Sequence, residues 1–135
     1  MERVEVVRSI CEATTRRDLE AVVALTHPDI EVEVLPDLPD VEAFRGHAGV
    51  RRGLELNWEA WESMRIEVER VIESRDEVVA LVRNHARGRG SGVDVVVSRG
   101  LVFGFRGDRI VRIRFHASQA EALEAAGLSE QPEQS

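Results

Sequence analysis

The sequence predicts a single α+β domain in which helices come first and a run of antiparallel strands follows. Residues 4–25 and 46–61 have helical apolar spacing, whereas residues 65–116 form Val- and Ile-rich stretches separated by short turns. Turns this short connect antiparallel neighbours, because parallel strands need a long crossover. A chain of 135 residues can bury one core. We therefore expect residues 1–128 to form one domain and the polar residues 129–135 to form a disordered tail.

The N-terminal part is expected to contain two helices and one strand. Residues 4–14 carry the apolar stripe of an amphipathic helix. Asp18 is a candidate N-cap for a short second helix, which ends before Pro28 because proline disfavours helix in the residue before it. Residues 30–34 alternate apolar and acidic side chains, which predicts a half-buried strand.

A long loop and a third helix are expected next. Two prolines and three acids mark the loop: Pro36, Pro39, Asp37, Asp40 and Glu42. The segment 46–61 then returns to helical spacing, with four apolar side chains on one face: Val50, Leu54, Trp58 and Trp61.

Four strands and a last helix complete the expected order. The strands are predicted at residues 65–73, 77–87, 93–105 and 109–116. Ser118 and Glu121 form a capping box that opens the last helix, and Gly127 closes it. A twisted sheet with helices packed across its mouth would enclose a pocket.

Composition excludes several kinds of chemistry. All 18 basic residues are arginine and the chain has no tyrosine, which excludes a Schiff-base lysine, a P-loop lysine and a phenolic oxyanion donor. One cysteine and four scattered histidines show no ligand spacing, so we expect no metal and no cofactor. No stretch approaches the roughly 18 apolar residues of a membrane span, and no signal peptide is visible. We expect a cytoplasmic protein without a membrane partner.

Charge is distributed unevenly along the chain. The net charge of −7 argues against nucleic acid as a partner, because such binding depends on neutralising phosphates. Residues 77–116 nevertheless carry eight arginines against three acids, while both flanking segments are acidic. This basic segment is interpreted either as a sheet face paired with acidic elements or a second subunit, or as a site for an anionic ligand.

Four local strings, in this order and spacing, resemble the SnoaL-like branch of the nuclear-transport-factor-2-like (NTF2-like) superfamily. They are FRGHAGVRR at residues 44–52, RGRGSG at 87–92, FGFRGDRIV at 103–111 and AEALEAAGL at 120–128. The resemblance implies a cone-shaped fold, in which a curved antiparallel or mixed sheet wraps around helices as a cystatin-like α+β barrel. It also implies a deep pocket and a homodimer formed through the outer face of the sheet.

The resemblance implies no single activity, because this superfamily includes ketosteroid isomerases, polyketide cyclases, epoxide hydrolases, dehydratases and pocket proteins without an assigned reaction. The isomerase base would fall at Val34 and its second acid at Leu101. The Arg-x-Asp of the epoxide hydrolases is matched by Arg99-Gly100-Leu101, which keeps the arginine and lacks the acid. The departures therefore fall on the residues that would carry the chemistry.

Three polar residues remain as catalytic candidates. Arg99 interrupts an apolar strand face, where a buried guanidinium needs a carboxylate or an anionic ligand, although a bulge at Gly100 would turn it outward. Asn84 lies in an otherwise apolar row and needs a hydrogen-bond partner, either in the protein or on a ligand. His47 is either a base that is neutral near pH 7 or a polar contact at a helix start.

The remaining site candidates are apolar. Trp58 and Trp61 either pack in the core or stack on a flat ligand. The other expected pocket walls are Val34, Leu101, Phe103 and Phe115. In the last strand, Arg112 and Arg114 alternate away from this apolar face and are expected to point outward.

Two functional hypotheses follow, both with a small hydrophobic molecule as partner. In the first, the protein is an enzyme of isomerase, cyclase or hydrolase type that acts on an anionic or carbonyl-containing metabolite. His47 or Asn84 would then assist proton transfer, and Arg99 would act as an electrostatic clamp. In the second, it is a non-catalytic ligand-binding or dimerisation module that has lost the family's carboxylates.

Overall fold

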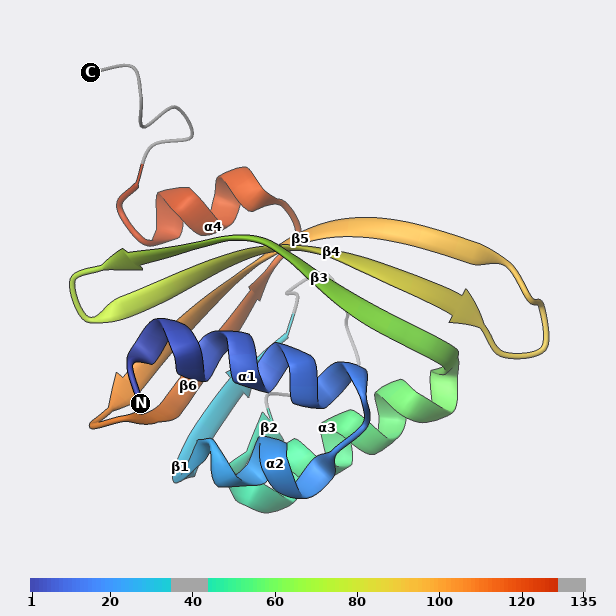
Figure 1. Cartoon of the computed structure of the whole chain (residues 1–135), viewed down its shortest axis with the longest axis horizontal. Coiled ribbons are helices and arrows are strands. Elements are labelled where there is room, and N and C mark those ends of the chain that lie inside the picture. Colours follow the sequence, from blue (N-terminus) through green and yellow to red (C-terminus); the bar gives the residue numbers. More distant parts are fainter. Residues whose placement is uncertain (35–43, 129–135) are drawn as a thin grey trace.

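The computed structural model describes residues 1–34 and 44–128. The prolines and acids of the expected loop, and the expected tail at 129–135, lie outside the described residues. The elements follow the predicted order of helices, then strands, then one last helix (Figure 1). They are α1 (Arg3–Thr15), α2 (Leu19–Ala24), β1 (Thr26–Glu33), β2 (Phe44–Arg45), α3 (Gly46–Ala60), β3 (Trp61–Ser74), β4 (Glu77–Gly88), β5 (Asp94–Arg106), β6 (Arg109–His116) and α4 (Gln119–Ala125).

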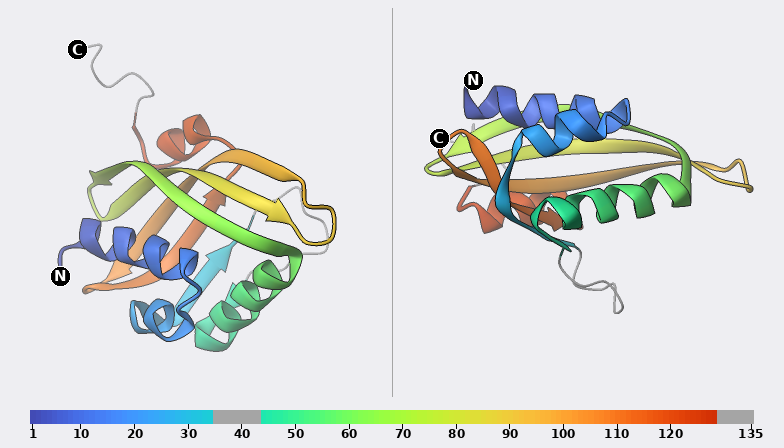
Figure 2. Two further views of the ribbon diagram at one scale, coloured as in Figure 1. Left: turned by 45° about the vertical axis from the view of Figure 1, so that its right-hand side comes forward. Right: turned by 90° about the horizontal axis from the view of Figure 1, so that it is seen from below.

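The strands form one curved, mixed sheet in the order β2-β1-β6-β5-β4-β3. All neighbouring pairs are antiparallel except β1 and β6, which are parallel. This pairing places the N-terminal strand β1 beside β6, between the C-terminal strands and the short strand β2. Within the described residues the sheet stays open between β2 and β3, so it forms a cone rather than a closed barrel (Figure 2).

Helices cover the two faces of the sheet unequally. The helices α1, α2 and α3 lie across the concave face, and α4 lies on the opposite face (Figure 1). The main core fills the concave side, where side chains from α1 meet alternate residues of the strands, such as Val78, Ala80 and Val82 of β4. A smaller core lies beneath α4 and contains Val79, Leu81, Val102, Ala122 and Leu123. Successive side chains of β4 point to opposite faces of the sheet, so this strand contributes to both cores.

Two local signals act as the sequence predicts. The Asp18 carboxylate accepts a hydrogen bond from the Ala21 N–H at 3.1 Å and caps α2. The Ser118 hydroxyl caps α4 in the same way, and Gly127 ends it with φ of +75°, a conformation that glycine adopts without strain.

The strand β1 begins earlier than predicted. It starts at Thr26, which pairs with Ile110, and runs through Pro28. The register shifts between Thr26 and Glu31, so the proline lies where the ladder is already irregular and no strand hydrogen bond depends on its missing N–H.

The last strand contains a bulge that simple alternation does not predict. Gly104 pairs with Arg112 and Phe105 pairs with Ile110, which leaves Val111 as an extra residue on β6. Ile110 and Ile113 are therefore both buried in the main core, although strict alternation would place them on opposite faces.

The helix α3 continues directly into β3, and two arginines hold this junction. Arg89, from the turn between β4 and β5, donates to the carbonyls of Trp58, Glu59 and Trp61 at 3.0–3.2 Å. Arg17 donates to the carbonyls of Trp61 and Glu62 at 3.0 Å. Carbonyls at a helix end have no partner within the helix, so these guanidinium groups supply it.

The α1–α2 region also contacts the outer edge of β3. The Ile66 N–H donates to the Thr15 hydroxyl at 3.0 Å. The same strand carries two register irregularities, between Trp61 and Ser63 and between Val68 and Arg70. At this edge of β3, the Ile66 N–H is therefore already hydrogen-bonded within the molecule, and the strand bends at the two irregularities.

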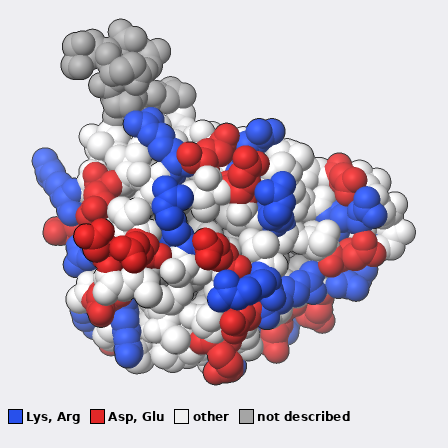
Figure 3. Space-filling model, viewed as in Figure 1, with Lys and Arg blue, Asp and Glu red and all other residues white. Residues whose placement is uncertain are grey.

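Four of the eight arginines of the C-terminal hairpins contact acids on other strands: Arg87, Arg106, Arg112 and Arg114. Arg112 and Arg114 point outward as predicted, and each contacts a different oxygen of Glu33 on β1, at 3.0 and 3.1 Å. His85 of β4 contacts Glu67 of β3 at 2.7 Å, and the hydrogen bond from His85 is the main reason that the pKa of Glu67 is lowered. Acidic and basic side chains are likewise interspersed over the face in Figure 3.

Candidate ligand-binding site

A cavity of about 280 Å³ lies between the concave face of the sheet and the helices α1 and α3. Its position follows from the fold, because the curved strands turn away from the helices and the side chains do not fill the whole space between them. The lining residues are mostly aliphatic or aromatic, and four of them carry neutral polar side chains: Thr14, Thr26, Asn57 and Asn84.

Five of the predicted site residues line this cavity: Val34, Asn84, Leu101, Phe103 and Phe115. Strand register brings them together. Leu101 pairs with Phe115, so the two side chains share one face of the sheet. Asn84 pairs with Ile66, which also lines the cavity. Asn84 is thus a polar group in the apolar wall, where the alternation of β4 predicts it.

The predicted arginine lies outside the lining. Arg99 pairs with the buried Val82, so its backbone position belongs to the concave face. Its guanidinium, however, donates to the carbonyls of Ser98 and Ala117 at 3.2 Å each. The long side chain reaches the Ala117 carbonyl, just after the end of the neighbouring strand β6, and main-chain acceptors thus satisfy its charge without a buried anion.

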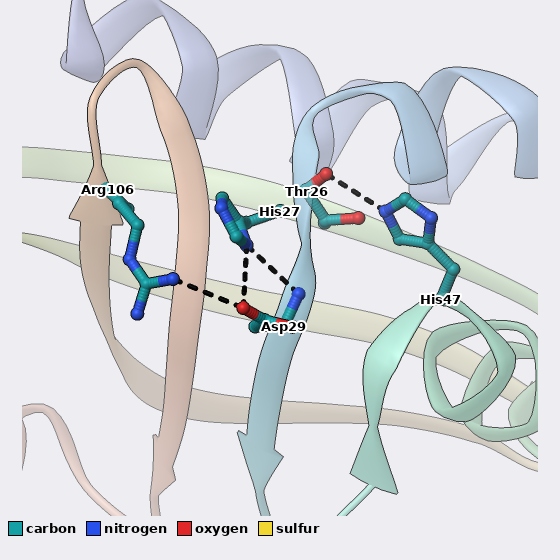
Figure 4. Close-up of polar contacts among 5 residues, drawn as sticks. All are labelled: Thr26, His27, Asp29, His47 and Arg106. Carbon is teal, nitrogen blue, oxygen red and sulfur yellow. Dashed lines mark hydrogen bonds and ion pairs between the residues drawn. The ribbon is translucent and has the colours of Figure 1, made fainter.

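The histidine of α3 is also held away from the cavity lining. His47 Nε2 lies 3.0 Å from the carbonyl oxygen of Thr26 and donates to it, so its role in the structure is a polar contact at the helix start (Figure 4). Nearby, Asp29 accepts from Arg106 at 3.2 Å and its N–H donates to His27 Nδ1 at 3.0 Å. Neither His27, Asp29 nor Arg106 lines the cavity.

The two tryptophans lie at the far end of α3 and not in the cavity wall. Trp61 is the first residue of β3, because the helix ends one residue earlier than its apolar spacing suggests. Trp58 lies beneath Arg17, whose guanidinium carbon is 5.8 Å from the ring centre. Asn57, rather than Trp58, continues the inner row of Val50 and Leu54.

Sequence reasoning missed several lining residues. Asn57 lies seven positions after Val50, a spacing that predicts the same helix face. Because its side chain is polar, the sequence pattern gave no reason to separate it from the surface residues. Gly49 and Gly53 also line the cavity, where they lie against Phe44. Phe44 belongs to the two-residue strand β2, which is too short to produce a pattern.

The lining that the structure describes holds no Asp, Glu, His or Arg side chain. Its one titratable group is the thiol of Cys11, and burial raises the pKa of this thiol to about 12. Cys11 is therefore a neutral thiol at pH 7 and not a nucleophilic thiolate. Across residues 1–34 and 44–128, no three His, Cys, Asp or Glu side chains gather in a way that would hold a metal ion, and no helix is long and apolar enough to cross a membrane.

An open, curved sheet with three helices on its concave face defines the α+β fold of the NTF2-like, cystatin-like proteins. Within this class, the family model described as a SnoaL-like domain matches residues 7–113. The match spans most of the chain, and the chain therefore belongs to the SnoaL-like domain family.

Solved structures with the same fold cover nearly the whole chain. An NTF2-like protein of unknown function from Burkholderia pseudomallei is 24% identical with a TM-score of 0.79, over 92% of this chain and 97% of that one. TerC, crystallised with polyporic acid, is 19% identical with a TM-score of 0.78, over 93% and 98% of the two chains. A proposed polyketide cyclase from Xanthomonas campestris is 18% identical with a TM-score of 0.75, over 92% and 96% of the two chains. At these identities the likeness shows the fold. No curated protein matches the sequence.

Proposed function

We propose that the protein binds a small, uncharged and mainly hydrophobic molecule in the cavity between the sheet and α3, without acid–base catalysis by the described cavity walls. The observation that carries this proposal is the chemistry of the lining, which is apolar with a few neutral polar groups. Such a lining is typical of ligand pockets, where few polar groups fix the orientation of an otherwise apolar ligand.

The size of the cavity sets the size of the ligand. An apolar cavity of about 150 Å³ holds one benzene ring. A cavity of about 280 Å³ therefore suits a bicyclic molecule or an aliphatic one of similar volume. Burial of that apolar surface would supply most of the binding free energy.

Of the two hypotheses from the sequence, the lining supports the non-catalytic one. General acid–base catalysis needs a titratable group within hydrogen-bond reach of the ligand. The thiol of Cys11, with a pKa of about 12, is a poor base at neutral pH. Arg99 is engaged by main-chain carbonyls and lies outside the lining, which argues against an anionic ligand at this site.

Binding of 2-naphthol and of 2-naphthoate, followed by the fluorescence of each probe at pH 7, tests the proposal. We expect 2-naphthol to bind more tightly than the anion, because the described lining offers no cation to pair with a carboxylate. Leu54→Trp should abolish 2-naphthol binding, because Leu54 faces the cavity from α3.

Leu56→Trp is the matched control, because Leu56 lies on the same helix with 40% of its surface exposed and outside the lining. This variant should bind 2-naphthol like the wild type. Circular dichroism verifies that both variants are folded. Tighter binding of 2-naphthoate, or unchanged binding in folded Leu54→Trp, would contradict the proposal.

A further inference from the structure

Two of the four polar side chains in the cavity, both threonines, have already used their only proton in a hydrogen bond. The Thr14 hydroxyl donates to the Ile10 carbonyl at 2.7 Å, and the Thr26 hydroxyl donates to the Val23 carbonyl at 2.9 Å. A hydroxyl has one proton and two lone pairs. The hydroxyl proton of each threonine is therefore engaged by a main-chain carbonyl, and the hydroxyl oxygen can only accept a further hydrogen bond.

Asn84 adds an acceptor that has no partner. Its Oδ1 is buried and receives no hydrogen bond. Its cross-strand neighbours are Ile66 on β3 and Val97 on β5, whose side chains have no donor to offer. Buried polar atoms in proteins are nearly always paired, so an oxygen left without a donor beside a cavity marks the place where a further group belongs.

The amide of Asn84 can adapt to such a group. The terminal torsion of asparagine is broad and roughly two-fold, so the amide can turn its oxygen or its nitrogen toward a ligand. A hydroxyl group matches both orientations, because it donates to Oδ1 or accepts from Nδ2. A ketone or an ether has no proton to donate, so it leaves the amide oxygen and both threonine oxygens without a donor.

We propose that the ligand carries a hydroxyl group as its polar handle, and that Asn84 determines this specificity. The inference rests on the proposed function of the cavity and names the class of ligand: an uncharged hydrophobic alcohol or phenol. The mainly apolar lining favours this selectivity, because a polar group without a partner is costly among apolar side chains.

A comparison of 2-naphthol with 2-methoxynaphthalene tests the proposal, because the two probes share a ring system and only the first has a proton to donate. Both are uncharged at pH 7, since phenols titrate near pH 10. We expect the wild type to bind 2-naphthol about tenfold more tightly than the methyl ether. In Asn84→Leu, which keeps a similar side-chain volume, this preference should disappear.

Arg83→Gln is the matched control, because Arg83 is the preceding residue of β4 and is exposed on the opposite face. It should keep the wild-type preference. Comparing the ratio of the two affinities within each variant removes the effect of the extra methyl group, since that effect is common to all three proteins.

The outcomes separate the two proposals. Equal affinities in the wild type, or an unchanged preference in Asn84→Leu, would overturn the role of Asn84 and leave the apolar cavity as a binding site. Failure of both probes to bind to the folded wild type would overturn the proposed function, and the hydroxyl specificity with it.

Discussion

At the scale of single residues, the described cavity wall includes a residue whose buried side-chain oxygen has no hydrogen bond. Asn84 lies in the apolar row of β4 between Val82 and Ala86, and both neighbours in that row are buried. Its Oδ1 lacks a hydrogen bond, which destabilises the folded state relative to an apolar residue at the same position. The residue is therefore explained better by a ligand than by stability.

This argument predicts that removing the amide stabilises the protein. Asn84→Leu should raise the free energy of unfolding by about 1 kcal/mol, because it replaces an unpaired buried acceptor with an apolar group of similar size. Urea denaturation followed by circular dichroism measures the change. Arg83→Gln, on the exposed face of the same strand, should change it by less than about 0.5 kcal/mol. A clear loss of stability in Asn84→Leu would mean that the amide has a structural partner.

From the buried thiol of Cys11 we predict that the stability of the fold depends on pH in the alkaline range. Burial raises the pKa of its thiol from 9.0 to about 12 in the folded state, so the unfolded chain releases this proton first. Its contribution to stability is therefore fully present below about pH 9 and is lost as the pH rises toward 12, by about 1.4 kcal/mol per pH unit.

Cys11→Ala isolates this contribution. Between pH 9 and pH 11 the stability of the wild type should fall more steeply than that of the variant, as measured by urea denaturation at each pH. Other groups that titrate in this range affect both proteins alike. Parallel curves would show that the thiol ionises equally easily in the folded and unfolded chains.

At the scale of elements, the position of α3 depends on groups that lie far from it in the sequence. Arg89 reaches three carbonyls at the end of this helix from the turn between β4 and β5. The helix supplies one wall of the cavity, including Val50, Leu54 and Asn57. The turn thus positions one wall of the cavity without lining it.

Arg89→Ala should loosen the last turn of α3. We expect faster amide hydrogen exchange at the α3–β3 junction and a loss of about 1 kcal/mol of stability, because carbonyls at the helix end lose charged donors. Arg109→Ala, at an exposed arginine of the β5–β6 hairpin, is the control and should leave exchange in α3 unchanged. Unchanged exchange in Arg89→Ala as well would show that packing alone holds the junction.

The contact between α4 and the sheet depends on the absence of a side chain at Gly100. A Cβ at this position would collide with the Cβ of Ala122 and lie 3.1 Å from the Ser118 carbonyl oxygen. Gly100→Ala should therefore displace α4 and cost about 1–3 kcal/mol, measured by chemical denaturation. Adding Ala122→Gly should recover part of this loss, although glycine itself weakens the helix. A neutral effect of Gly100→Ala would show that α4 shifts freely on the sheet.

The positions of helices and strands could be predicted from the sequence more successfully than the pairing of the strands. The alternation of Val and Ile located β4 and β6 within one residue, because it reports directly which side chains are buried. The bulge at Val111 and the parallel pairing of β1 with β6 depend on distant contacts, and no local pattern contains them. The same distinction holds for the site. Alternation along the strands predicted the positions of Asn84 and Phe115. It did not predict the position of the Arg99 guanidinium, because this flexible group binds carbonyl acceptors that only the folded chain brings near.

At the scale of the whole molecule, the outer face of the sheet is only partly covered. The helix α4 lies over one part of it, while the far part of β3, β4 and β5 extends beyond the helix (Figure 2). Val96 lies on this far part with 51% of its surface exposed, opposite His85. We propose that two copies of the chain associate through this uncovered face, as the resemblance to the NTF2-like proteins implies.

Sedimentation velocity tests this association. The wild type should sediment as a dimer at micromolar concentration, and Val96→Asp should shift it toward the monomer, because a charge would be buried in the interface without a partner. Val93→Asp is the control, since Val93 is similarly exposed but precedes β5 in the hairpin turn. A monomeric wild type, or an equal effect of both substitutions, would contradict the proposed interface.

The capped edge of β3 has a consequence for how such molecules can meet. An uncovered edge strand is a template on which another chain can add a strand, and this is a common route to fibrils. Here the Ile66 N–H is taken by Thr15, the carbonyls of Trp61 and Glu62 are taken by Arg17, and two irregularities bend the strand. In the part of the chain that the structure describes, the opposite edge strand is β2, which has two residues. Sheets of neighbouring molecules therefore have little opportunity to join edge to edge, which favours discrete particles over open-ended polymers.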